Sequence, residues 1–154
     1  MSEDMNDTRS KLEQRARQYQ AWLCEEGYRA QEPLWDHGTN TWDVHVKYEG
    51  VTLVIVFDVD DPDFVRILMP NFWAVDGANL GPALLALDLA NKKCKCAKVY
   101  MNGRRDDTSV ATEFLDHGHL LRAPALLRYL AITVNAARFF ASAVQEQIDA
   151  MQAA

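Results

Sequence analysis

Four aspartates lie within six positions of the stretch FDVDDPDFVRILMP, at Asp58, Asp60, Asp61 and Asp63. Carboxylates at this density could bind a divalent cation or work as a general acid and base. A calcium loop that starts at Asp58 needs a glycine at its sixth place and a bidentate acid at its twelfth. Those places hold Asp63 and Met69. The calcium pattern is therefore not met.

A polar turn explains the same aspartates. Asp61, Pro62 and Asp63 match the first three positions of a type I turn, in which Asp caps the backbone and Pro presets φ. Four close carboxylates do not require a cation, because two unit charges 4 Å apart in water repel by only about 1 kcal/mol. We therefore interpret Asp58–Asp63 as a solvated connection between strands, and a divalent-metal site or a catalytic pair stays the alternative.

A second candidate site is the stretch DGANLGPALL, which places Gly77 and Gly81 around the start of a helix. Backbone N–H groups at a helix start can bind phosphate. The lysine and hydroxyl of a phosphate loop are missing, so a capping loop is the preferred interpretation. A phosphate-ligand sensor or enzyme that uses Gly77–Gly81 is the alternative.

Histidines and cysteines form two close pairs, His117 with His119 and Cys94 with Cys96. Neither pair has the spacing of zinc ligands, which typically leaves two to five residues between them. Cys24 makes the cysteine count odd, and no disulfide framework is evident, so we expect three free thiols in a reducing compartment. No metal or cofactor is predicted.

Neither a catalytic residue nor a nucleic-acid site is predicted. The four serines lie outside any nucleophile elbow. The chain has 16 basic and 22 acidic residues, a net charge of −6, which disfavours nucleic acid and anionic membranes. A basic cluster carries no aromatic stacking pattern and is interpreted as a solvated face. It consists of Lys92, Lys93, Lys95, Lys98, Arg104 and Arg105.

Large aromatic residues are the more promising candidates, because those left exposed make good anchors for a partner protein. Most aromatic side chains belong to cores. The set that lies near predicted element edges is Trp22, Trp35, Trp42, Phe72 and Trp73. Of these we predict Trp22, Trp42, Phe72 and Trp73 to contact a protein partner.

The first half of the chain predicts one helix and three strands. Leu12, Ala16, Tyr19 and Leu23 recur at helical spacing, Asn6, Asp7 or Thr8 can cap this helix, and Gly27 ends it. Alternating residues 42–48 predict a strand with one wet face. The apolar run 51–57 follows a tight turn at Glu49 and Gly50 and predicts a strand buried on both faces. Residues 64–69 form the third strand, ended by Pro70.

The second half predicts a helix, a hairpin and a long final helix. Leu80, Leu84 and Leu87 give the apolar stripe of the helix in 76–96, and residues 97–101 and 109–115 form the hairpin. The last stripe, in 123–151, is Leu127, Leu130, Val134, Ala137, Ala141, Val144, Ile148 and Met151. The predicted fold is a single α+β domain over 1–154, two-layered, with a five-stranded antiparallel sheet and three helices in the order α-β-β-β-α-β-β-α.

The final helix is long for its sheet. It would span about 40 Å at 1.5 Å per residue, whereas strands of six or seven residues reach about 20 Å. A second subunit would bury Val144, Ile148 and Met151 on the overhang, which predicts a homodimer. The first residues lack the apolar run of a signal peptide, and no apolar run reaches the roughly 18 residues of a membrane span, so we expect a cytoplasmic protein.

The runs GVTLVIVFDVDDPDFVRILMPNFW and NKKCKCAKVYMN resemble the YbjN family, described as candidate bacterial sensory transduction regulators of the type III secretion chaperone-like fold. The resemblance covers roughly Tyr19 to Phe140. It implies a cytoplasmic homodimer that binds protein and catalyses nothing, and secretion chaperones of this fold hold a segment of another protein extended.

In those chaperones the dimer forms through the second helix, here Leu80, Leu84 and Leu87, whereas the length argument favours Val144 and Ile148 of the third. Both arrangements stay open. The sequence thus predicts a non-enzymatic dimeric protein-binding module, a regulator or a chaperone, whose partners are itself and one unidentified protein.

Overall fold

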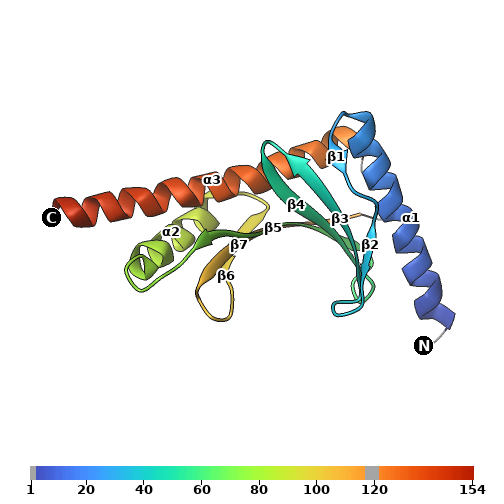
Figure 1. Ribbon diagram of the computed structural model, residues 1–154, viewed down its shortest axis with the longest axis horizontal. Coiled ribbons are helices and arrows are strands. Elements are labelled where there is room, and N and C mark those ends of the chain that lie inside the picture. The colour runs from blue at the N-terminus through green and yellow to red at the C-terminus, as the bar shows by residue number, and fades with distance from the viewer. Residues whose placement is uncertain (1–2, 117–121) are drawn as a thin grey trace. The chain divides into compact units, whose positions relative to one another are not determined.

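The computed structural model describes residues 3–116 and 122–154, which form three helices and seven strands (Figure 1). In chain order they are α1 (Glu3–Glu25), β1 (Arg29–Ala30), β2 (Leu34–Asp36), β3 (Thr41–Tyr48), β4 (Val51–Asp58), β5 (Phe64–Ala74), α2 (Leu80–Lys93), β6 (Ala97–Met101), β7 (Asp107–Leu115) and α3 (Ala123–Ala153). The α+β class with three helices is confirmed.

The sheet has seven strands, so the predicted count of five was wrong. Its order is β1-β3-β4-β5-β7-β6, and β2 also pairs with β3. The two strands that sequence analysis missed, β1 and β2, are only two and three residues long. Strands this short show no alternation of polar and apolar residues, so the segment that contains them resembled an irregular loop.

The chain clusters into two compact units. The first comprises Met1–Ile67 and Glu113–Leu130, and the second comprises Leu68–Thr112 and Ala131–Ala154. Strands β5 and β7 and helix α3 each pass from one unit into the other along the chain.

In the first unit, α1 packs against β1, β3 and β4. The predicted stripe Leu12, Ala16, Tyr19 and Leu23 is confirmed, since each side chain is at most 1% exposed. The predicted cap was wrong, because the helix already begins at Glu3 and Asn6, Asp7 and Thr8 lie within it.

The first helix ends as predicted at Gly27, whose φ is +88°. The N–H of Gly27 donates to Cys24 O at 3.0 Å, and the N–H of Tyr28 donates to Leu23 O at 2.9 Å. This pair of bonds is the Schellman motif, which favours glycine because the backbone is left-handed there.

The hairpin of β3 and β4 turns through Glu49 and Gly50, whose φ angles of 47° and 85° are those of a type I′ turn. The alternation of β3 is confirmed: Trp42, Val44, Val46 and Tyr48 are buried. Strand β4 is less covered than predicted. Leu53, Ile55 and Phe57 are fully buried, but on its other face Thr52 is exposed and Val56 is half-buried, so this strand has one face that reaches solvent.

The third predicted strand was too short, because β5 continues through Pro70 to Ala74. Asn71 has a φ of +49°, and its N–H donates to Ser109 Oγ at 3.1 Å. Proline is tolerated within a strand at such an irregular position, where the ladder of backbone hydrogen bonds is interrupted.

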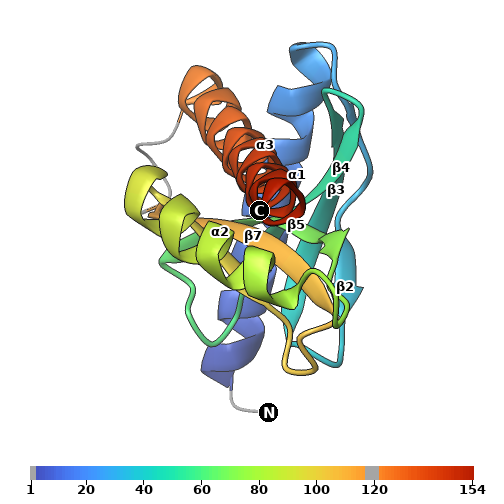
Figure 2. The same cartoon turned by 90° about the vertical axis from the view of Figure 1, so that its left-hand side faces the viewer.

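In the second unit, α2 runs beside the C-terminal part of α3 (Figures 1 and 2). The stripe predicted for α2 was wrong: Leu84 is 43% exposed, and Leu80 and Leu87 are only partly buried. The helix buries small residues instead, namely Pro82, Ala83, Ala86 and Ala90. The same core includes, from α3, Ala136, Ala137, Phe140, Ala143 and Val144.

Helix α3 has 31 residues, close to the predicted length. Val144 is fully buried within its own chain, so its assignment to a dimer interface was wrong. Ile148 is half-buried against the same core, and Met151 is 64% exposed. The unburied part of α3 is therefore shorter than the length argument predicted.

One buried hydrogen bond of the first unit joins residues 97 positions apart. Tyr19 Oη donates to Asp116 Oδ2 at 2.5 Å, and Asp116 is only 3% exposed. Burial and the neighbouring carboxylate raise the pKa of Tyr19, because both disfavour the phenolate. The folded state therefore favours the neutral phenol.

We expect Tyr19→Phe to lower the free energy of unfolding by about 1.5–3 kcal/mol at pH 7, the usual contribution of a hydrogen bond to a charged group. Since folding raises the Tyr19 pKa, its contribution is complete below the unfolded value of about 10 and falls above it, by about 1.4 kcal/mol per pH unit. Urea unfolding of both proteins at pH 7 to 11 measures this difference.

The matched control is Tyr28→Phe, which removes a hydroxyl from the same unit. Tyr28 stacks on Tyr48 with ring centroids 5.4 Å apart. We therefore expect the ring of Tyr28, rather than its hydroxyl, to contribute to stability. An equal loss of stability in both variants, or a difference that does not change with pH, would contradict the role given to Tyr19.

Candidate interaction surface

The aspartate loop is a turn, as predicted. Asp58 Oδ1 accepts the N–H of Asp60 at 2.9 Å, and Asp61 O accepts the N–H of Phe64 at 3.2 Å. The second bond closes a four-residue turn with Pro62 at its second position. Pro62 O in turn accepts Arg15 Nη1 at 2.8 Å, so α1 holds the loop in place.

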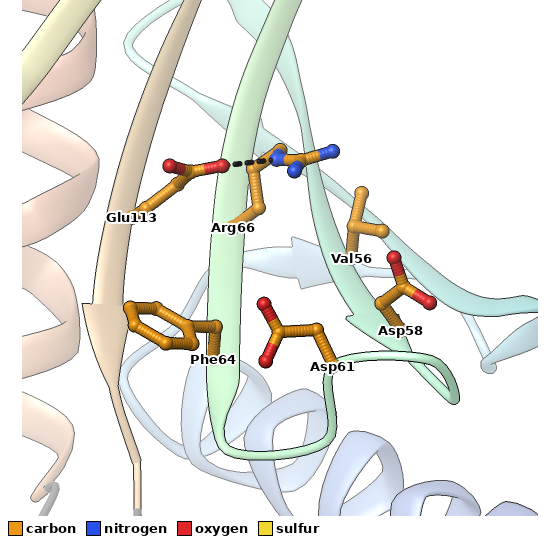
Figure 3. Close-up of a pocket in the computed structure, with 6 residues that line it drawn as sticks. All are labelled: Val56, Asp58, Asp61, Phe64, Arg66 and Glu113. Carbon is orange, nitrogen blue, oxygen red and sulfur yellow. Dashed lines mark hydrogen bonds and ion pairs between the residues drawn. The ribbon is translucent and has the colours of Figure 1, made fainter.

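A shallow hollow of about 150 Å³ lies beside this loop (Figure 3). Its lining includes Asp58, Asp61 and Glu113, but Arg66 Nε lies 2.7 Å from Glu113 Oε1 and pairs with that carboxylate. In the described ranges 3–116 and 122–154, no three His, Cys, Asp or Glu side chains come together as metal ligands. The loop thus offers no assembled ligand set for the metal alternative. His117 and His119 lie outside the described residues.

The stretch that leads into α2 is held by hydrogen bonds from its own side chains. Asp76 Oδ1 accepts the N–H groups of Ala78 and Asn79, both at 2.9 Å, and Asn79 Oδ1 accepts the N–H of Asp76 at 2.9 Å. Helix α2 begins one residue later, at Leu80, and its N-cap residue Asn79 makes no side-chain capping bond. The Asp76 carboxylate places a negative charge beside this helix start, which disfavours a phosphate there. This arrangement favours a structural loop over the phosphate alternative.

The aromatic residues predicted as protein anchors are mostly occupied within the chain. Trp42 is 9% exposed, and its Nε1 donates to Arg9 O at 3.1 Å. Phe72 and Trp73 make edge contacts with Phe140, with ring centroids 5.6 and 6.2 Å away. Trp42 is thus buried, whereas Phe72 and Trp73 are half-buried and keep part of their surface accessible beside their contacts with Phe140.

Trp22 is half-buried, with its ring centroid 5.3 Å from that of Tyr19. It therefore keeps partial access to solvent.

Exposed leucines on α2 replace the aromatics as the best candidates for partner contacts. Leu84 is 43% exposed and Leu85 is 61% exposed. They lie on the side of the helix opposite Ala83, Ala86 and Ala90, and Gly81 and Asp88 share their face at helical spacing. We call this face, Gly81, Leu84, Leu85 and Asp88, the outer face of α2. Adjacent exposed leucines are typical of an interaction site.

A second apolar feature of the same unit lies between the start of α2 and the end of α3. It is a hollow of about 380 Å³, which we call the terminal hollow. Its apolar lining comes from Pro82, Ile148 and Met151, and its polar lining from Asp76, Asn79 and Gln152. Because Met151 is exposed, the terminal hollow is accessible to an apolar side chain of a partner.

Side-chain amides bond backbone groups on one strand at each end of the sheet. The last strand, β6, meets Asn91 of α2: Asn91 Nδ2 donates to Val99 O at 2.9 Å, and Asn91 Oδ1 accepts the N–H of Val99 at 2.8 Å. On β1, Ala30 O accepts Gln20 Nε2 of α1 at 3.4 Å. An extended partner needs free backbone groups to add a strand, so it is disfavoured at Val99 and at Ala30 O.

The three cysteines are free, as predicted. Cys24 and Cys96 are exposed, and Cys94 is half-buried, which raises the pKa of its thiol. None of the helices in the described residues is long and apolar enough to cross a membrane.

No model of a known protein family and no curated protein sequence matches the chain. Its structure is similar to that of an uncharacterized protein from Methanothermobacter thermautotrophicus, with a TM-score of 0.63 and 14% identity over 85% of this chain and 96% of the other. It is also similar to the crystal structure of YbjN from E. coli, a candidate transcription regulator, with a TM-score of 0.56 and 14% identity over 88% of this chain and 92% of YbjN.

The chain has a YbjN-like fold. This finding confirms the resemblance to YbjN at the level of the fold. At 14% identity this similarity shows the fold alone. It carries no information on the role of the outer face of α2.

We expect Asn91→Leu to lower the free energy of unfolding by about 1–3 kcal/mol, because Val99 loses partners for both of its outward backbone groups. The amide hydrogen of Val99 should exchange faster in the variant, which hydrogen exchange followed by NMR measures residue by residue.

Asn135→Leu is the control, since Asn135 is an exposed helical asparagine; we expect a change within about 0.5 kcal/mol. Unchanged exchange at Val99 in Asn91→Leu would mean that the amide does not protect the edge.

Proposed function

We propose that the chain is a non-enzymatic protein-binding module that works as a homodimer in the cytoplasm, as a regulator or a chaperone. The outer face of α2 carries this proposal, because its two large apolar side chains are exposed while the same helix buries only small residues. A soluble helix normally has the opposite arrangement.

A second copy of the chain is the partner that fits this face best. In a two-fold dimer each α2 meets the same surface of its partner. Gly81 has no side chain, so the leucines of one copy can approach the helix backbone of the other. Asp88 is paired with Lys92 at 2.6 Å, so the only carboxylate of the outer face is already neutralised. The resemblance to secretion chaperones, which pair through this helix, supports the same choice.

The third helix is the weaker candidate for the dimer. Val144 is fully buried and Ile148 is half-buried in their own unit. Only Met151, near the end of α3, is largely exposed among the predicted overhang residues. This favours α2 over the arrangement that the length of α3 suggested.

The terminal hollow is the place proposed for the other partner protein. Because backbone groups of Val99 and Ala30 on the edge strands are already bonded by side chains, the partner binds through side chains rather than by adding a strand. Pro82, Ile148 and Met151 favour an apolar side chain, and the acidic balance of the chain disfavours nucleic acid and anionic membranes as partners.

We expect the wild-type protein to sediment with the mass of two 17.5 kDa chains and Leu84→Asp to sediment as one, because a buried unpaired charge is costly. Ile148→Asp should stay dimeric, as should the control Leu115→Asp, which places the same charge on a leucine of the first unit that is 55% exposed. A dimeric Leu84→Asp with a monomeric Ile148→Asp would place the interface on α3, and a monomeric wild type would refute the dimer.

Met151→Asp tests the terminal hollow separately. We expect the tagged wild-type protein to capture one stoichiometric protein from its native cytosol at near-physiological salt, and Met151→Asp to lose it while remaining a dimer. Leu115→Asp again serves as the control and should keep the partner. Capture of the homodimer alone, or equal capture by Met151→Asp, would contradict a protein-binding role for the hollow.

A further inference from the structure

Three polar side chains stand in one line across the first unit, on the face of the sheet that reaches solvent. Arg29 of β1 is directly opposite Lys47 of β3, and Lys47 is directly opposite Thr52 of β4. Residues opposite each other in antiparallel strands project to the same side of the sheet. Lys47 Nζ donates to Thr52 Oγ1 at 2.6 Å, which holds the ammonium group over the sheet. We call Arg29, Lys47 and Thr52 the cationic row.

The two cations of this row have no carboxylate partner in the described part of the chain, although acidic residues outnumber basic ones. Ion pairs there engage Lys11, Arg17, Arg66 and Lys92. Like charges directly opposite each other on neighbouring strands are destabilising. An anion between Arg29 and Lys47 would attract both side chains and so offset the repulsion between them.

His45 extends the row by two positions along β3. It lines the same hollow, and its Nδ1 is shielded from solvent without a hydrogen-bond partner among the described residues. The other ring nitrogen, Nε2, can donate a hydrogen bond when it carries a proton. The nearest acid along the strand, Asp43, accepts Thr41 Oγ1 at 2.9 Å.

These groups surround a hollow of about 500 Å³ lined by Arg29, Ala30, Gln31, His45, Val46, Lys47 and Thr52. No carboxylate lines it. The side chains of arginine and lysine only donate hydrogen bonds, and those of glutamine, histidine and threonine can also donate. The volume lies within the range of about 300–1,000 Å³ that is common for small-molecule sites.

We propose that this hollow binds the oxyanion group of a small ligand, a phosphate or a carboxylate. Arg29 supplies the planar fork that bonds two oxygens of such a group at once, and Lys47 supplies a second positive charge from the neighbouring strand. Thr52 orients the ammonium group, and His45 donates from the same strand. The site lies in the first unit and is independent of the outer face of α2, so it adds a ligand to the proposed protein-binding role.

The test is a titration of the full chain with inorganic phosphate and, separately, with acetate, at constant ionic strength set by chloride. The ring ¹H–¹³C signal of His45 and the backbone amides of Arg29 and Lys47 report binding at the site itself. We expect a saturable shift of these signals with one of the two anions. Tighter phosphate binding identifies a phosphate group as the ligand, and tighter acetate binding identifies a carboxylate.

Arg29→Gln and Lys47→Gln should each weaken binding by about tenfold, the loss expected for one charge-assisted hydrogen bond. Lys98→Gln and Arg104→Gln are the matched controls, because each removes one exposed positive charge from the second unit; they should bind like the wild type. An equal loss of anion affinity in all four variants would show only a general effect of net charge and would contradict the proposed site. So would the absence of a saturable shift in the wild-type protein.

Discussion

The hydrogen bond between Tyr19 and Asp116 is the constraint on which the first unit depends. A carboxylate that is 3% exposed is costly to bury unless it is hydrogen-bonded, and this one is bonded to a residue of α1. The backbone N–H of Asp116 also donates to Asp63 O at 2.8 Å. The end of β7 is thereby tied to both the helix and the aspartate loop.

This constraint explains why the aspartate loop is held as a turn. Its backbone oxygens are engaged, at Pro62 by Arg15 and at Asp63 by Asp116. Its carboxylates are then left to cap the turn or to face water. A connection held by its backbone can carry several negative charges at little cost, because exposed charges are screened. Those charges oppose the pairing of the apolar strands β4 and β5 with other molecules.

Patterns of short range were predictable from the sequence, and contacts of long range were not. The turn at Glu49 and Gly50 and the buried stripe of α1 follow from residue types within a few positions. The stripe of α2 was wrong because side-chain size, set by the packing of α2 against α3, outweighed hydrophobicity: alanines such as Ala86 face the core, and Leu84 does not. No local sequence pattern indicates the buried hydrogen bond of Asp116, since its partner Tyr19 lies 97 positions away.

The cationic row is a further example of a long-range arrangement that the sequence does not reveal. Arg29 and Lys47 are 18 positions apart, and only the register of β1 on β3 makes them neighbours. Because β1 has two residues, no periodicity could have revealed that register.

Bonded backbone groups on the edge strands and exposed side chains together favour one mode of recognition. Asn91 satisfies both outward backbone groups of Val99, and Gln20 bonds Ala30 O, so backbone-to-backbone pairing is disfavoured at these positions. The features that remain accessible to a partner are formed by side chains. They are the leucines on α2, the terminal hollow and the cationic row. Side-chain recognition depends on the identity of the partner, whereas strand addition depends mainly on its backbone. For the proposed protein-binding role, these features favour selectivity for one partner over general binding of extended chains.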